Sequence, residues 1–187
     1  LAETILTKDE LRSKYGFKEN DKIIITGGKM GVYKGTLDLI NAIEELNTKN
    51  NTKLILFGKF EDEETLEHAK SRDFITIAGW CDRKKTLELL KLSDVACWPI
   101  HHTTLIEDSI AVETPIVIRR TGTTEHLIDG NGCWLKDGNK EDIVASLNNL
   151  LFRDNTKMEE LQASCMKMRD RLSYNNISKR IIDYIQK

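Results

Sequence analysis

Features that mark specialised classes of protein are scarce in this sequence. Proline occurs only 2 times in 187 residues, and no apolar run approaches the roughly 20 residues that cross a membrane. Neither sign of charge dominates, because 28 Lys and Arg residues face 30 Asp and Glu residues and leave a net charge of −2. That balance excludes a nucleic-acid surface spread over the whole chain, though not a local basic pocket. With 40% hydrophobic and 31% charged residues, we expect a soluble domain with a real core and no nucleic-acid partner.

Cysteine is also sparse, and its spacing argues against two common uses. Cys81, Cys97, Cys133 and Cys165 lie too far apart for zinc knuckles or redox pairs, in which roughly two to four residues separate the thiols. The pattern predicts buried thiols in a reducing compartment and therefore a cytoplasmic protein. The first residues, from Leu1, match neither a signal peptide nor an initiator sequence, so we expect further chain upstream.

Short apolar runs alternate with longer amphipathic stretches before residue 139. Most of the runs are rich in Ile, Val, Leu or Phe without polar alternation, which is typical of strands covered on both faces. The alternation predicts an α/β protein with a Rossmann-like parallel sheet of about six strands and helices on both faces. The predicted strands are 22–26, 53–57, 74–77, 95–99, 115–118 and 133–135, and the predicted helices are 8–15, 35–48, 61–71, 83–92, 104–112 and a short one at 124–128.

The final part of the chain has a different pattern. From residue 139 to residue 187 there are no strand signals, only amphipathic stretches that predict helices at 140–152, 156–171 and 178–186. The chain shows no internal repeat and no low-complexity linker. It therefore predicts one domain over 1–187, in which 1–21 leads into the first strand and 139–187 forms a helical tail.

The segment after the first predicted strand combines glycines with lysines. It is Thr26-Gly27-Gly28-Lys29-Met30-Gly31-Val32-Tyr33-Lys34-Gly35-Thr36. Glycines let a backbone approach a ligand closely, and the free N–H groups of a helix start favour anions. The segment contains neither the Gly-x-Gly-x-x-Gly of dinucleotide sites nor a Walker loop. A phosphate-binding loop and a glycine turn with solvated lysines both fit it.

Ligands of an open parallel sheet bind at the carboxyl ends of its strands, so the later loops also hold candidate residues. After the third strand, Asp82 is placed to cap the helix that begins at Arg83. After the fourth, His101 and His102 precede Thr104, which with Glu107 has the spacing of a capping box. The free amides there suit an anion, and the histidines fit either a phosphate contact or a merely polar loop.

The sequence contains no motif typical of a metal site or of a catalytic serine nucleophile. His101 and His102 are neighbours rather than an i, i+4 pair, and no Asp-x-Asp occurs anywhere. The sequence also lacks the Gly-x-Ser-x-Gly elbow of serine hydrolases. We therefore predict no metal site.

Three motifs occur in order along nearly the whole chain. They are Gly27-Gly28-Lys29 with Lys34-Gly35, then Thr114-Pro115-Ile116-Val117, then Thr124-Glu125-His126-Leu127-Ile128-Asp129-Gly130-Asn131-Gly132. Together they resemble the C-terminal domain of GT-B glycosyltransferases of the group 1, family four type. Segment 7–17 is similar to the interdomain segment that precedes this half. The resemblance implies one half of a GT-B fold, with 1–21 as the interdomain lead-in and an N-terminal acceptor domain outside this chain.

The resemblance also implies an activity and its partners. In that family, a sugar passes from a nucleoside-diphosphate sugar to a growing glycan or a lipid-linked acceptor, with retention of configuration and without a metal or other cofactor. This half binds the nucleotide sugar, so the chain alone is expected to bind the donor and turn over little. The resemblance is compatible with peripheral association of the full-length enzyme with the inner face of the membrane.

Site residues follow from the resemblance by position. Lys29 and Lys34 are expected to contact the donor diphosphate as catalytic cations. The other expected donor-binding residues are Gly27 and Gly28, the nucleobase loop at Gly79 and Trp80, and the segment Thr103, Thr104 and Leu105. Asp108 falls on the family's glutamate that holds the ribose hydroxyls, with Glu107 as the alternative.

Two further positions depart from the family pattern. Ile100 stands where the family has its first glutamate, so His101 or His102 is the candidate group that meets the donor sugar; we place His102 among the catalytic residues. Glu113 replaces the glycine before Thr114 and Pro115. Because the acid is lost, a non-catalytic sugar-nucleotide-binding module is an alternative, and a nucleotide-sugar epimerase of the same fold is another.

Overall fold

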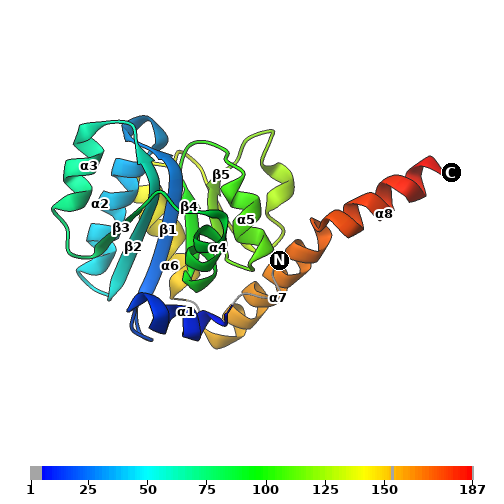
Figure 1. Ribbon diagram of the computed structural model, residues 1–187, viewed down its shortest axis with the longest axis horizontal. Helices are drawn as coiled ribbons and strands as arrows, with labels where there is room; N and C mark the ends of the chain where they lie inside the picture. Colours follow the sequence, from blue (N-terminus) through cyan, green and yellow to red (C-terminus); the bar gives the residue numbers. More distant parts are fainter. Residues whose placement is uncertain (1–5, 153, 187) are drawn as a thin grey trace.

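The computed structural model describes residues 6–152 and 154–186. Parallel strands form one 6-stranded sheet in the order β3-β2-β1-β4-β5-β6 (Figure 1). The strands are β1 (Lys22–Met30), β2 (Thr52–Phe60), β3 (Ile75–Gly79), β4 (Val95–Trp98), β5 (Ile116–Arg119) and β6 (Gly132–Leu135). The strand order reverses between β1 and β4. In open α/β sheets, ligands bind in the crevice at such a reversal.

Helices cover both faces of the sheet, as the sequence predicts (Figure 1). They are α1 (Lys8–Tyr15), α2 (Thr36–Asn47), α3 (Glu63–Lys70), α4 (Arg83–Leu92), α5 (Leu105–Ala111), α6 (Lys140–Leu151), α7 (Asn155–Arg171) and α8 (Tyr174–Ile185), with 3-10 turns η2 (Val32–Lys34) and η3 (Glu125–Leu127). Successive β1 side chains enter different cores: Ile24 lies with residues of α2 and α6, and Ile23 and Ile25 lie with residues of α1, α4 and α5. Burial on both faces explains why the strands are continuous apolar runs.

The first two strands are longer than predicted. They run together to Met30 and Phe60, so Gly27, Gly28 and Lys29 belong to β1 and not to a loop. Glycine allows this close pairing, because a Cβ on Gly58 (φ +108°) would lie 2.2 Å from the Gly28 carbonyl oxygen. The glycines that suggested a turn instead allow the sheet to continue toward its carboxyl edge.

Capping residues explain the other differences in element bounds. The helix predicted at 61–71 begins at Glu63, because Asp62 is its N-cap. The last helix begins at Tyr174, before the predicted 178, because the Ser173 side chain caps it. The short helix predicted at 124–128 is the 3-10 turn η3. Of the cysteines, Cys97 and Cys165 are buried as predicted, whereas Cys81 and Cys133 are only half-buried.

The C-terminal helices α7 and α8 run away from the sheet (Figure 1). Leu161, Cys165 and Met168 of α7 are buried. By contrast, α8 buries no residue, and Tyr174, Ile181, Ile182, Tyr184 and Ile185 are all exposed. Across the described residues, no helix has the length and apolarity needed to cross a membrane.

Asp94, just before β4, joins α1 to the sheet. Its carboxylate accepts hydrogen bonds from Lys8 Nζ and Arg12 Nη2, both at 2.7 Å, and from the Ile23 N–H at 2.8 Å. Burial would raise the pKa of Asp94, but the charges of Lys8 and Arg12 and the hydrogen bonds outweigh it, so the pKa is lowered. The ionised carboxylate is therefore a structural anchor at the end of the sheet opposite the β1/β4 carboxyl ends.

We expect Asp94→Asn to lower the free energy of unfolding by about 2–3 kcal/mol, because charge-assisted hydrogen bonds to a largely buried group are lost. Urea-induced unfolding followed by circular dichroism measures the change. Asp73→Asn, at an exposed aspartate before β3, is the control and should stay within about 0.5 kcal/mol of wild type. Equal effects of the two substitutions would contradict the anchoring role.

The same residue predicts a pH dependence. Because the folded pKa of Asp94 is lowered, its contribution is fully present above the unfolded value of about 3.9 and is lost as the pH falls through the folded pKa. The stability difference between wild type and Asp94→Asn should therefore narrow below about pH 4. A difference that stays constant down to about pH 2 would show that ionisation of Asp94 does not contribute.

Candidate functional site

A cavity of about 160 Å³ lies at the carboxyl ends of β1 and β4, where the strand order reverses. Its walls come from the end of β1, the turn η2, the start of α2, the end of β4 and the loop that follows β4. The lining residues are Thr26, Gly27, Lys29, Met30, Lys34, Thr36, Trp98, His101, His102 and Thr103. Residues far apart in the sequence are therefore brought to one hollow by the sheet topology.

Trp98 fixes the base of the cavity. Its indole Nε1–H donates a hydrogen bond of 3.1 Å to the Gly27 carbonyl oxygen, and the side chain is buried. On the other side, a Cβ on Gly27 would lie 2.3 Å from the Phe57 ring. Gly27 therefore has a steric reason to lack a side chain, and the end of β1 is held in one position.

Lys29 and Lys34 both line the cavity, as the sequence-based hypothesis requires. No ion pair among the described residues includes either of them; the Lys34 ammonium lies 5.0 Å from the centre of the Tyr33 ring. Lys59 lies beside Lys29 in the register of β1 and β2, which adds a third cation at this edge. Cations without acidic partners attract an anion.

The start of α2 faces the same region. Gly35 is its N-cap, so no side chain accepts a hydrogen bond from the first-turn amides. Glycine is needed there, because φ is +73° and a Cβ would lie 2.8 Å from Ile100 and 2.9 Å from Pro99. A helix start whose first turn has no side-chain cap, beside two lysines, is suited to bind a phosphate group.

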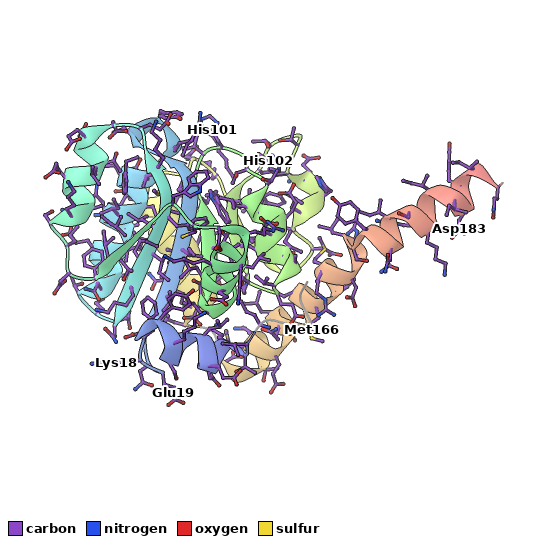
Figure 2. All side chains as sticks on the ribbon, in the orientation of Figure 1. Lys18, Glu19, His101, His102, Met166 and Asp183 are labelled. Carbon is purple, nitrogen blue, oxygen red and sulfur yellow. The ribbon has the colours of Figure 1, made fainter. Side chains whose placement is uncertain are left out.

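The two histidines lie on the loop beyond β4 (Figure 2). His102 Nε2 is 3.0 Å from Glu107 Oε1, and the His101 ring lies 6.1 Å from the Tyr33 ring, centre to centre. The capping box predicted for Thr104 and Glu107 is wrong. Thr104 has helical backbone angles and its side chain caps no amide, while Glu107 contacts His102 instead.

Several predicted site residues lie outside the cavity lining. They are Gly28, Gly79, Trp80, Thr104, Leu105, Glu107 and Asp108. Trp80 follows β3 at the outer side of the sheet and is 82% exposed. Asp108 contacts the Arg83 guanidinium, so that carboxylate already has a partner, whereas Glu107 Oε2 is buried without a hydrogen-bond partner in the described structure. Asp82 caps α4 as predicted, accepting from the Lys85 N–H at 2.7 Å.

Other residues line the cavity without having been predicted from the sequence motifs. Trp98 and Thr36 were not candidates, although Thr36 directly follows the Lys34-Gly35 motif and its hydroxyl accepts from the Gly31 N–H at 3.1 Å. The adjacency of Thr36 to the motif was an available signal. For metals, the described residues hold no group of three or more His, Cys, Asp or Glu side chains that could bind an ion; metal-free chemistry remains a prediction.

Comparison with known proteins agrees with this architecture. Residues 7–178 match the family described as "Glycosyl transferases group 1". An uncharacterized glycosyltransferase of Methanocaldococcus jannaschii, MJ1607, is 22% identical over 185 residues, which cover 94% of this chain and 47% of that protein. The chain thus spans about half the length of this relative.

Solved structures match the fold. Anabaena Alr3699/HepE, in complex with UDP and glucose, has a TM-score of 0.75 at 16% identity over 96% of this chain and 52% of its own. The C-terminal domain of a glycosyl transferase group 1 family protein (LpcC) from Francisella tularensis has a TM-score of 0.72 at 13% identity, over 91% of this chain and 96% of its own. The expected half of a GT-B fold is confirmed. Because the family match covers most of the sequence, the chain belongs to the group 1 glycosyltransferase family.

Proposed function

We propose that this chain binds a nucleoside-diphosphate sugar and serves as the donor half of an enzyme that transfers the sugar to a glycan or lipid-linked acceptor. The observation that carries the proposal is the meeting of Lys29, Lys34 and the uncapped start of α2 at the β1/β4 reversal. The expected acceptor domain, the retaining outcome and a cytoplasmic or peripheral membrane location are part of the same proposal.

The chemistry of these groups fits sugar transfer. As the bond between sugar and diphosphate breaks, negative charge grows on the departing diphosphate. Two fixed cations and the amides of a helix start stabilise that charge at the moment it forms. No group in this account requires a metal, and the nucleotide sugar itself is the only small molecule that the proposal needs.

The volume of the cavity indicates which part of the donor it can hold. At about 160 Å³ it is smaller than a typical ligand pocket of roughly 300–1,000 Å³, so we place the diphosphate and the adjoining sugar inside. The nucleobase lies outside, where exposed Trp80 offers a stacking surface. Asp108, which contacts Arg83, and Glu107, whose Oε1 lies 3.0 Å from His102 Nε2, both remain candidates for the ribose contact.

One observation favours a second function, that of a binding module without catalysis. At the position of the family's first glutamate, Ile100 packs near Gly35 and Gly138, and it supplies no acid. A diphosphate-release assay on the full-length protein separates the functions. Release of UDP from a UDP-sugar only in the presence of an acceptor glycan identifies a transferase, no release identifies a binding module, and conversion of the sugar without an acceptor identifies an epimerase.

Lys34→Ala should weaken UDP binding to this chain by about 1.5–3 kcal/mol, because a charged contact to the diphosphate is lost. We choose UDP as the probe because the Anabaena neighbour was solved with it. Isothermal titration calorimetry measures the affinity. Lys49→Ala, at an exposed lysine beyond α2, is the control and should bind like wild type. An unchanged affinity of Lys34→Ala would remove Lys34 from the site.

The double variant His101→Ala/His102→Ala should keep its UDP affinity but lose roughly 3- to 10-fold in affinity for UDP-sugars, the equivalent of about one hydrogen bond. The comparison uses calorimetry with UDP and with a panel of UDP-sugars. His126→Ala, at an exposed histidine of η3, is the matched control. Equal binding of every UDP-sugar, together with unchanged turnover in the full-length enzyme, would contradict a role of these histidines at the donor sugar.

A further inference from the structure

Asp62 lies between two loops at the carboxyl edge of the sheet. Its Oδ2 accepts a hydrogen bond of 2.9 Å from the Val32 N–H, in the turn of residues 31–35 that carries Lys34 and is called here the Lys34 turn. Its Oδ1 accepts one of 2.8 Å from the Thr65 N–H, in the first turn of α3. Asp62 does not itself line the cavity. One carboxylate thus connects α3 to the Lys34 turn.

The Lys34 turn has little apolar packing of its own. The residues of η2 are not buried, and Val32 and Tyr33 are 48% and 51% exposed. Inside the turn, the N–H groups of Lys34 and Gly35 donate to the carbonyls of Gly31 and Val32. Among the described residues, the β2–α3 loop makes two hydrogen bonds to this turn. Asp62 accepts one from the Val32 N–H, and Glu61 accepts a longer one of 3.3 Å from the Tyr33 hydroxyl.

Gly31 is an independent sign that the carboxylate belongs against this turn. Its φ of 168° is extended backbone that any residue adopts, so its conformation does not require glycine. A Cβ there would, however, lie 2.3 Å from Asp62 Oδ2. The absence of a side chain at residue 31 is therefore explained by the approach of Asp62.

We propose that Asp62 is a positioning residue: it holds the Lys34 turn so that Lys34 meets the donor diphosphate. The inference rests on the proposed function, because it needs Lys34 to bind a phosphate group. The hydrogen bonds that Asp62 accepts from Thr65 and from Val32 lower its pKa, so the carboxylate is ionised at neutral pH and both oxygens accept.

Electrostatics alone predicts the opposite effect of removing Asp62. A carboxylate near a phosphate site repels the ligand, so its removal should tighten binding if charge were all that mattered. If Asp62 acts by holding the Lys34 turn, its removal weakens binding. The direction of the change therefore distinguishes the two roles.

The central variant is Asp62→Ser. Serine is a good N-cap, so α3 keeps its cap, but the shorter side chain no longer reaches Val32. We expect UDP affinity in calorimetry to fall at least fivefold, with the melting temperature close to that of wild type. The control is Glu61→Gln, which removes a negative charge from the residue before Asp62 and leaves the hydrogen bond between Asp62 and Val32 intact. This variant should bind UDP as wild type does or more tightly. Unchanged or tighter binding by Asp62→Ser would overturn the proposal.

A second substitution tests the same contact from the other side. Gly31→Ala keeps Asp62 but displaces its carboxylate, which lies at the end of a flexible side chain. It should reproduce the loss of UDP affinity even if Asp62→Ser folds poorly. A Gly31→Ala protein that binds UDP like wild type would contradict the proposal.

A double-mutant cycle separates this inference from the proposed function. If Asp62 acts through Lys34, Asp62→Ser causes no further loss in a Lys34→Ala background. Weaker binding in Lys34→Ala but not in Asp62→Ser would overturn the positioning role alone. Wild-type UDP binding by Lys34→Ala would overturn the diphosphate contact on which the proposed function depends. Additive losses would show that Asp62 acts by a route other than Lys34.

Discussion

Two lysines that line one cavity without acidic partners are the constraint on which the proposed site depends. Lys29 and Lys34 come from the end of a strand and from the turn that follows it, and neither forms an ion pair within the described structure. Like charges repel, so bringing two lysines to one cavity costs free energy, and Lys59, opposite Lys29 in the register of β1 and β2, adds to the positive charge. The lysines stay at the carboxyl edge of the sheet because Trp98 and the glycines of β1 fix the backbone there. A dianionic ligand would offset the cost.

Much of the fold could be predicted because burial on both faces leaves a clear pattern. Each strand of the sheet coincides with a predicted apolar run, and the buried parts of β1, β2, β4 and β5 are covered by helices on both faces. The hydrophobic pattern did not predict the full length of a strand where its residues are glycine or lysine. Gly27, Gly28 and Lys29 continue β1 through backbone pairing with β2, and their side chains give no apolar signal. The starts of α3 and α8 differ from the predicted ones, because the side chains of Asp62 and Ser173 cap these helices and fix their first residues.

The site likewise has residues that the sequence predicts and residues that only the structure reveals. Local chemistry left the glycine-lysine segment open between a phosphate-binding loop and a glycine turn, and the family resemblance selected Lys29 and Lys34 as site residues. The partners across the cavity depend on which strand lies beside β1, and only the topology provides that. Trp98 is therefore visible only in three dimensions. Glu107 shows the limit of a local motif: its spacing to Thr104 fits a capping box, yet it contacts His102.

The departures from the family pattern lie in different parts of the structure. Ile100, which packs near the Gly35 N-cap of α2, and Glu113 replace a glutamate and a glycine. Lys29 stands where the family has an arginine, whereas Lys34 matches the family's lysine. Glu113 has a φ of 64°, which costs a non-glycine residue roughly 1–2 kcal/mol. Its carboxylate contacts Arg169 and accepts a hydrogen bond of 3.3 Å from the Gln162 amide, so the strained residue also holds α7 in place. In the proposed donor site, the lysines expected at the diphosphate and the histidines expected at the sugar come from different elements, so a chain can change the second set while keeping the first.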